Sequence, residues 1–178
     1  MNDRPSSSMA QPERARSTDL AMLGIYLNDH LMGATAGVER VCHLVHAVRG
    51  SALAAALGPV AAEIAQDRTS LLGIMRDLGI PVRRYKVCAG WTAEKMARLK
   101  SNGRLARRSP LSTFQELEML RLGVEGKAAG WQTLSRLTAT EKRLDPQLLD
   151  DLLERARRQQ RVVEEWHARQ AGSAFERG

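Results

Sequence analysis

Four long stretches of the sequence repeat apolar residues at intervals of three and four, the spacing that places them on one face of an α-helix. The stretches cover about residues 18–49, 52–79, 110–139 and 146–172. Each begins or ends at a strong helix boundary: Gly50, Gly79 followed by Pro81, and the pairs Ser109–Pro110 and Asp145–Pro146. Only 4% of the residues are aromatic, which disfavours strands. The pattern predicts an all-α fold of four long helices.

The lengths of the connections predict how these helices pair. The first two helices, and likewise the last two, are joined by short turns, so each pair is expected to form an antiparallel hairpin. Residues 82–102 also read as helix and form a long crossover between the hairpins. We therefore predict a four-helix bundle that occupies residues 18–175 as a single domain. Residues 1–17 lack apolar periodicity and are rich in Ser, Pro and Arg, so they are expected to be a disordered arm.

The crossover is strongly basic. Residues 83–108 hold nine Lys and Arg against one acid, Glu94, while the whole chain has a net charge of +7. The nine cations are candidates for contact with an anionic partner: Arg83, Arg84, Lys86, Lys95, Arg98, Lys100, Arg104, Arg107 and Arg108. Tyr85 and Trp91 lie among them, a mixture that suits nucleic-acid binding. The stems of Lys and Arg can equally cover the apolar surface of a bundle, so a structural role stays open.

The segment Tyr26–Gly33 (YLNDHLMG), together with the long crossover, resembles bacterial ferritin-like four-helix-bundle proteins of uncharacterised function. The resemblance covers most of residues 18–172 as architecture. Ferritin-like di-iron proteins take one Glu from each of two helices and a Glu-x-x-His from each of the other two, so the resemblance implies a candidate site for iron or manganese. The matching residues are Glu39, Glu63, Glu125, Glu164 and His167. Gln66 stands where the second histidine would be.

Four other polar residues lie closer to the apolar faces of the expected helices than these glutamates do. They are His30, Asp67, Lys127 and Gln159. All four lie at similar distances from their hairpin turns, so they could meet near mid-bundle. A buried carboxylate needs a cation or several hydrogen-bond donors, and Lys127 or His30 could supply one to Asp67. We therefore predict a buried polar layer around Asp67 that fixes how the helices align.

Two features concern the helix interiors. Gly33 and Gly37 lie one turn apart in the first helix and are expected to let a neighbouring helix approach closely. The pair Gly58–Pro59 is expected to break or kink the second helix, unless Pro59 opens it.

The chain shows no Ser/His/Asp arrangement, and Cys42, His43 and His46 lack a fourth zinc ligand at a suitable spacing. We therefore expect a non-catalytic bundle with a binding or interaction role and no cofactor, a ferritin-like bundle that has lost its metal. The alternative is a ferritin-like metal-binding or oxidoreductase protein, and a third reading is nucleic-acid binding through the crossover. No apolar run is long enough to span a membrane. The expected protein is soluble and cytoplasmic, with reduced thiols at Cys42 and Cys88, and can form homo-oligomers.

Overall fold

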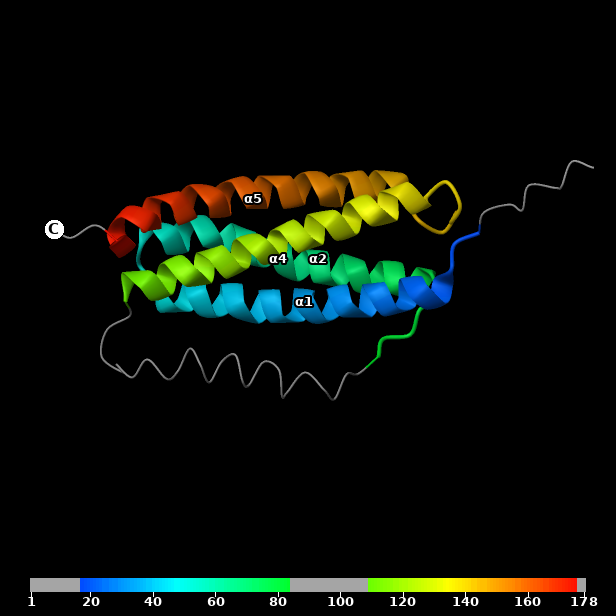
Figure 1. Ribbon diagram of the computed structural model, residues 1–178, viewed down its shortest axis with the longest axis horizontal. Helices are drawn as coiled ribbons and strands as arrows, with labels where there is room; N and C mark the ends of the chain where they lie inside the picture. Colours follow the sequence, from blue (N-terminus) through cyan, green and yellow to red (C-terminus); the bar gives the residue numbers. More distant parts are fainter. Residues whose placement is uncertain (1–16, 84–108, 176–178) are drawn as a thin grey trace, which may run out of the picture.

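The computed structural model describes residues 17–83 and 109–175, which form four long α-helices and no strand (Figure 1). The helices are α1 (Leu20–Ala47), α2 (Ala52–Asp77), α4 (Pro110–Leu137) and α5 (Pro146–Phe175). The predicted all-α class is confirmed. Within these ranges, no helix combines the length and the apolar character needed to cross a membrane. The predictions of a disordered arm over residues 1–17 and of a helical crossover over residues 82–102 fall almost wholly outside the described residues.

Each helix begins at a polar residue whose side chain accepts a hydrogen bond from a backbone N–H of the first turn. These residues are Asp19, Ser51, Ser109 and Asp145. Beyond α1 and α2 the chain turns at Gly50 (φ 80°) and Gly79 (φ 69°), a conformation that glycine adopts without strain. The local boundary signals therefore place the helix ends within three residues of the ranges expected from the sequence.

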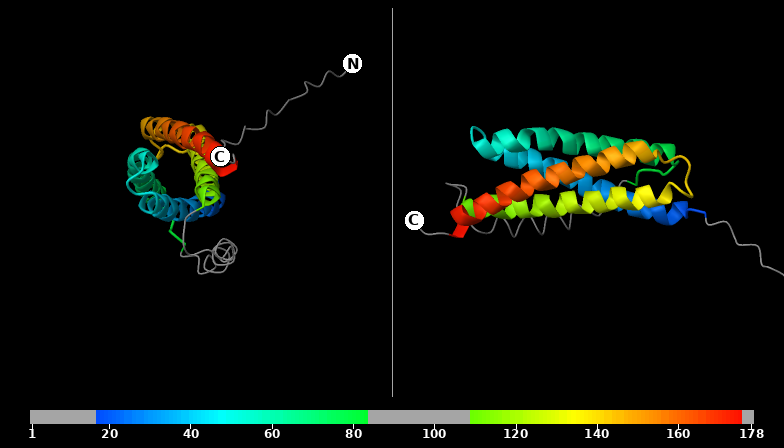
Figure 2. Two further views of the ribbon diagram at one scale, coloured as in Figure 1. Left: turned by 90° about the vertical axis from the view of Figure 1, so that its left-hand side faces the viewer. Right: turned by 90° about the horizontal axis from the view of Figure 1, so that it is seen from above.

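The four helices pack as a bundle. In Figure 1, α1 and α2 lie side by side and are joined by a turn at one end, and α4 and α5 are joined at the other end. The end view in Figure 2 shows a ring in which α1 contacts α2 and α4, and α5 contacts α4 and α2. The end of α2 and the start of α4 lie at opposite ends of the bundle (Figure 1).

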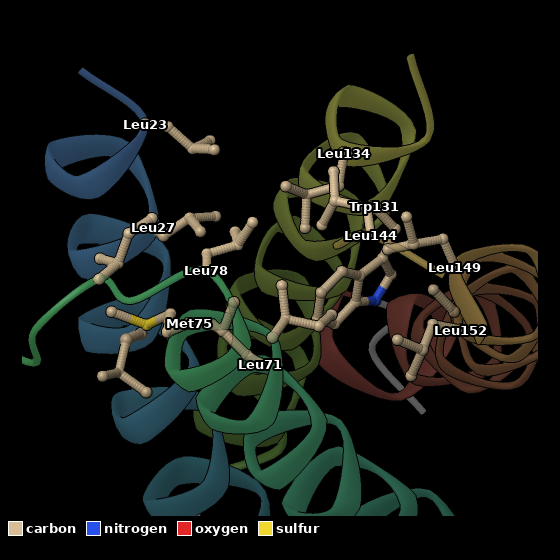
Figure 3. Close-up of a cluster of buried hydrophobic side chains, with 14 of the residues drawn as sticks. Leu23, Leu27, Leu71, Met75, Leu78, Trp131, Leu134, Leu144, Leu149 and Leu152 are labelled. Atoms are coloured by element: carbon tan, nitrogen blue, oxygen red, sulfur yellow. The ribbon is translucent and has the colours of Figure 1, made fainter. Parts of the chain in front are cut away.

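Two clusters of buried apolar side chains fill the bundle, one toward each end. The first contains Leu27, Met75, Trp131 and Leu149 (Figure 3), and the second contains Val41, Leu57, Leu117 and Val163. On each helix the clusters divide near mid-length, between Leu31 and Val41, Ile64 and Leu71, Val124 and Ala128, and Ala156 and Val163. A fully buried leucine stabilises a fold by roughly 1.5–3 kcal/mol. These clusters therefore supply most of the packing energy and leave a separate layer between them.

Two polar side chains fix the direction in which the chain leaves α2. Asn28 of α1 donates to the Pro81 carbonyl oxygen at 3.1 Å and accepts from the Arg83 backbone N–H at 2.6 Å. Arg143, in the α4–α5 loop, donates through Nη1 to the Leu78 carbonyl oxygen at 3.0 Å. Backbone groups beyond a helix end lack helical partners, so these contacts anchor the exit segment on both sides.

The expectation for Gly33 and Gly37 is wrong. A Cβ added at either position would meet no other atom within 4 Å, so both glycines face open space. The close approach occurs at Gly130 of α4 instead, where a Cβ would lie 3.1 Å from the His30 ring. A stripe of small residues can therefore lie on the outside of a bundle without an approaching helix.

The helix ends and interiors depart from expectation at two further points. Helix α2 continues through Pro59, and both Pro59 and Ala55 are exposed, so water can bind the Ala55 carbonyl that loses its helical partner. Helix α5 extends to Phe175, beyond the expected end at residue 172. The Phe175 ring packs edge-on against Phe114 with centroids 5.3 Å apart, a contact that supports the last turn although the apolar pattern has lapsed.

Candidate functional site

A cluster of charged and amide side chains surrounds Asp67 between the two apolar clusters. Asp67 is 1% exposed. Its Oδ2 lies 2.5 Å from Lys127 Nζ and accepts a hydrogen bond from Gln159 Nε2 at 3.2 Å. Its Oδ1 lies 2.9 Å from Arg155 Nε. Helices α2, α4 and α5 thus converge on one buried carboxylate.

Gln159 connects the members of this cluster and is itself 1% exposed. Its Oε1 accepts a hydrogen bond from Lys127 Nζ. Its Nε2 donates to Asp67 and, at 2.9 Å, to Glu63 Oε2. Both ends of the buried amide are therefore satisfied, as the cost of burying unpaired polar groups requires.

The cluster is electrically balanced, because the carboxylates of Glu63 and Asp67 face the cations of Lys127 and Arg155. Burial lowers the pKa of Lys127, and the charge of Asp67 and its hydrogen bond oppose that shift. Arg155 Nε is close enough to Asp67 for an ion pair but is not aligned for a hydrogen bond. The guanidinium also donates through Nη1 to Gln66 Oε1 at 3.1 Å. Such pairing offsets part of the cost of burying the Asp67 carboxylate.

The spacing of these residues along their helices explains why the polar side chains point inward. Asp67 lies three residues after Ile64 and four before Leu71, and Lys127 lies three after Val124. Gln159 lies three after Ala156. The same periodicity that builds the core therefore directs them into it. Both oxygens of Asp67 face a cation from a neighbouring helix, so the arrangement is suited to fixing helix alignment.

His30 lies apart from this cluster. Its ring packs against Gly130 and, edge-on, against Tyr26, with ring centroids 4.4 Å apart. Gly130 lies about one helical turn beyond Lys127 on α4, so the His30 ring contacts α4 at a different height from the Lys127 side chain. Burial lowers the pKa of His30, against the opposing charge of Asp29. The structure thus brings together Asp67, Lys127 and Gln159 but not His30.

The glutamates of the candidate metal site are engaged with other partners. Glu63 accepts a hydrogen bond from Gln159 in the polar cluster. Glu125 Oε2 accepts from Gln160 Nε2 at 3.3 Å, and Glu164 Oε1 lies 3.2 Å from Arg121 Nη2. Each of these carboxylates lies one position beside the apolar stripe. A neighbouring polar side chain on the facing helix is therefore its nearest partner.

The remaining two candidate ligands lie elsewhere. Glu39 is exposed on α1. His167 stacks on the Phe114 ring with centroids 4.3 Å apart. Across residues 17–83 and 109–175, no three His, Cys, Asp or Glu side chains are grouped to hold a metal ion. The residues present do not fit a di-metal site.

Of the nine cations proposed for an anionic partner, Arg83 alone lies in the described part of the chain. It is exposed, and its backbone N–H is held by Asn28. The other eight lie outside the described residues: Arg84, Lys86, Lys95, Arg98, Lys100, Arg104, Arg107 and Arg108.

Sequence reasoning missed Arg155 as a member of the cluster. The available signal was its position four residues before Gln159, which places both on one side of α5. That signal could not separate Arg155 from Arg157, Arg158 and Arg161, because a long side chain can reach inward from the edge of the apolar face.

No protein-family model, curated protein or solved structure matches the chain.

Proposed function

We propose that the protein is a non-catalytic, ferritin-like helical bundle with a binding or interaction role, in which an ion-paired polar cluster stands where a di-metal site would be. The observation that carries the proposal is the pairing of buried Asp67 with Lys127 and Arg155, 2.5 and 2.9 Å away. In di-metal bundles, mid-bundle carboxylates are neutralised by bound ions. Here the protein's own cations neutralise the carboxylate.

Bound metal ions and the cations of the protein would compete for the same space beside Asp67. A divalent ion placed about 4 Å from the Lys127 ammonium would be repelled by about 8 kcal/mol at an effective dielectric constant of about 20. Arg155 would add to this repulsion. The cluster also offers one fully buried carboxylate, whereas a di-metal site uses four carboxylates and two imidazoles.

The chain path supports the ferritin-like arrangement. The end of α2 and the start of α4 are separated by about the length of the bundle (Figure 1). Helix α4 has 28 residues, so this length is about 42 Å. A long crossover between hairpins is the feature that separates ferritin-like bundles from simple up-down bundles.

The surface supports an interaction role. Met22 of α1 and Leu122 of α4 are 63% and 61% exposed, and they belong to a set of large apolar side chains left on the outside of these adjacent helices. Leu20, Ile25, Met32, Leu111 and Met119 complete that set. Exposed apolar side chains mark an interaction surface where they form a contiguous patch, which is the property an interaction role requires of these helix faces.

Metal analysis tests the proposal. The full chain, produced without a histidine tag from cells supplied with iron or manganese, is purified and its metal content measured by mass spectrometry. We expect less than about a tenth of an ion per chain. About two ions per chain would refute the proposal and favour a metal-binding or oxidoreductase protein, the outcome that a di-metal bundle requires.

A further inference from the structure

A second polar feature lies on the outside of the bundle, between α4 and α5. It is a hollow of about 320 Å³, lined by Arg121 and Glu125 from α4 and by Arg157, Gln160, Arg161 and Glu164 from α5. Figure 2 shows these two helices running side by side over most of their length. The hollow shares no residue with the Asp67 cluster, so the two sites are separate.

The hollow has more positive than negative charge, and its carboxylates are already in use. Glu164 pairs with Arg121 at 3.2 Å, and Glu125 accepts a hydrogen bond from Gln160. In the described part of the chain, Arg157 and Arg161 have no ion-pair or hydrogen-bond partner. Each guanidinium carries five N–H donors. Two adjacent, uncommitted guanidinium groups therefore line the same hollow.

The two arginines place like charges close together on α5. Arg157 and Arg161 are four residues apart, so they are neighbours on the surface of α5. Like charges at this spacing repel each other and weaken a helix. An anion between them would convert this repulsion into attraction. Arginine suits phosphate in particular, because its planar group donates two parallel hydrogen bonds to an oxyanion.

We propose that this hollow binds the phosphate group of a small molecule, with Arg157 and Arg161 as the principal donors and Arg121 at the rim. A volume of about 320 Å³ lies at the lower end of the range for small-ligand sites. Glu125 and Glu164 flank the hollow and would repel the neighbouring phosphates of a nucleic acid, so the arrangement favours a compact ligand. Their oxygens and the Gln160 amide can accept or donate hydrogen bonds to hydroxyl groups beside the phosphate. The inference is independent of whether the bundle holds metal.

Calorimetric titration of the full chain with inorganic pyrophosphate tests this site at a fixed ionic strength set with sodium chloride. Three proteins are compared: the unaltered chain, Arg157→Gln/Arg161→Gln, and the control Arg158→Gln/Arg169→Gln. The control removes the same charge from α5, but Arg158 and Arg169 lie outside the hollow and pair with Glu154 and Glu165. All four arginines are largely exposed, so far-UV circular dichroism should show that every variant folds.

We expect saturable binding to the unaltered chain. Its dissociation constant should rise at least about tenfold in Arg157→Gln/Arg161→Gln, since each charge-assisted hydrogen bond is worth about a factor of ten. The control should change it by less than about threefold, because Arg158 and Arg169 do not line the hollow and are already paired with Glu154 and Glu165. Equal weakening in both variants would show a diffuse charge effect and overturn the proposal. So would the absence of saturable binding, or unaltered binding in Arg157→Gln/Arg161→Gln, which would assign the phosphate to another part of the chain.

Discussion

Replacing Asp67 with Asn removes the charge at the centre of the polar cluster while keeping the size of the side chain. Lys127 and Arg155, whose side chains are 14% and 21% exposed, would then face Glu63 as their remaining carboxylate. Breaking a buried ion pair from one side costs about 3–5 kcal/mol. Both cations retain some access to water, so we expect the free energy of unfolding to fall by about 3 kcal/mol, the lower end of this range. For a chain of this size, that corresponds to a fall in Tm of about 6–12 °C.

Urea unfolding followed by far-UV circular dichroism measures this loss as a lower midpoint at unchanged slope. Asp77→Asn is the matched control on the same helix. Its side chain is 55% exposed and pairs with an exposed Arg76, so its removal should cost less than about 1 kcal/mol. If Asp67→Asn were no more costly than Asp77→Asn, Asp67 would not be the electrostatic centre of the bundle.

A combined replacement separates charge from packing. In Asp67→Leu/Lys127→Met/Gln159→Leu, the buried polar groups are exchanged for apolar ones of similar size, and Arg155 can turn toward Gln66 and solvent. Replacing a whole buried ion-paired group by well-packed apolar residues is often neutral or stabilising. We expect stability within about 1 kcal/mol of the unaltered chain. A triple variant as unstable as Asp67→Asn would show that the loss arises from packing, against the reasoning from uncompensated charge.

Two further predictions follow from the pKa of Lys127 and from the glycines. Because the folded-state pKa of Lys127 is lowered, the unfolded chain binds more protons between that pKa and 10.5, so this residue makes stability rise with pH in that window. Asp67→Asn removes the carboxylate that opposes this lowering, so the pKa of Lys127 should fall further. The urea midpoint of the variant should therefore rise more steeply with pH, between neutral pH and pH 10, than that of the unaltered chain. An equal dependence of the midpoint on pH in both proteins would contradict this. Gly33→Ala should stabilise the protein by up to about 1 kcal/mol, because its Cβ meets nothing within 4 Å and alanine favours helix. Gly130→Ala should stabilise the protein less than Gly33→Ala, or destabilise it, since its Cβ would lie 3.1 Å from the His30 ring. Equal increases in Tm for the two variants would show that the His30 ring can move aside at no cost in stability.

The inward position of a polar residue can follow from the apolar spacing of its own helix alone. Asp67, Lys127 and Gln159 each sit three or four residues from core positions on their own helix, so apolar spacing is enough to direct them into the bundle. Which of them touch depends on the axial offset between helices, which the spacing does not specify. His30 shows the consequence, because it meets α4 at Gly130, about one turn from Lys127.

The glutamates of the candidate metal site show a second limit. Their positions beside the apolar stripe are equally compatible with turning inward to a metal or outward to a partner. The choice is made by the facing helix, which offers Gln160 to Glu125 and Arg121 to Glu164. Sequence spacing within one helix contains no information about that partner. Burial and pairing could be assigned only once the helices were placed side by side.

The position of the polar cluster gives it a role that the apolar clusters cannot perform. Sliding one helix by a turn, about 5.4 Å, moves its apolar residues to the next set of apolar neighbours, so apolar packing alone discriminates weakly between the two alignments. A slide of α4 would separate Lys127 from Asp67 and leave the largely buried ammonium without its carboxylate, at a cost of about 3–5 kcal/mol. That cost is a large share of the 5–15 kcal/mol by which folded domains are typically stable. A buried charge cluster that adds little net stability can therefore still decide which alignment of the four helices is populated.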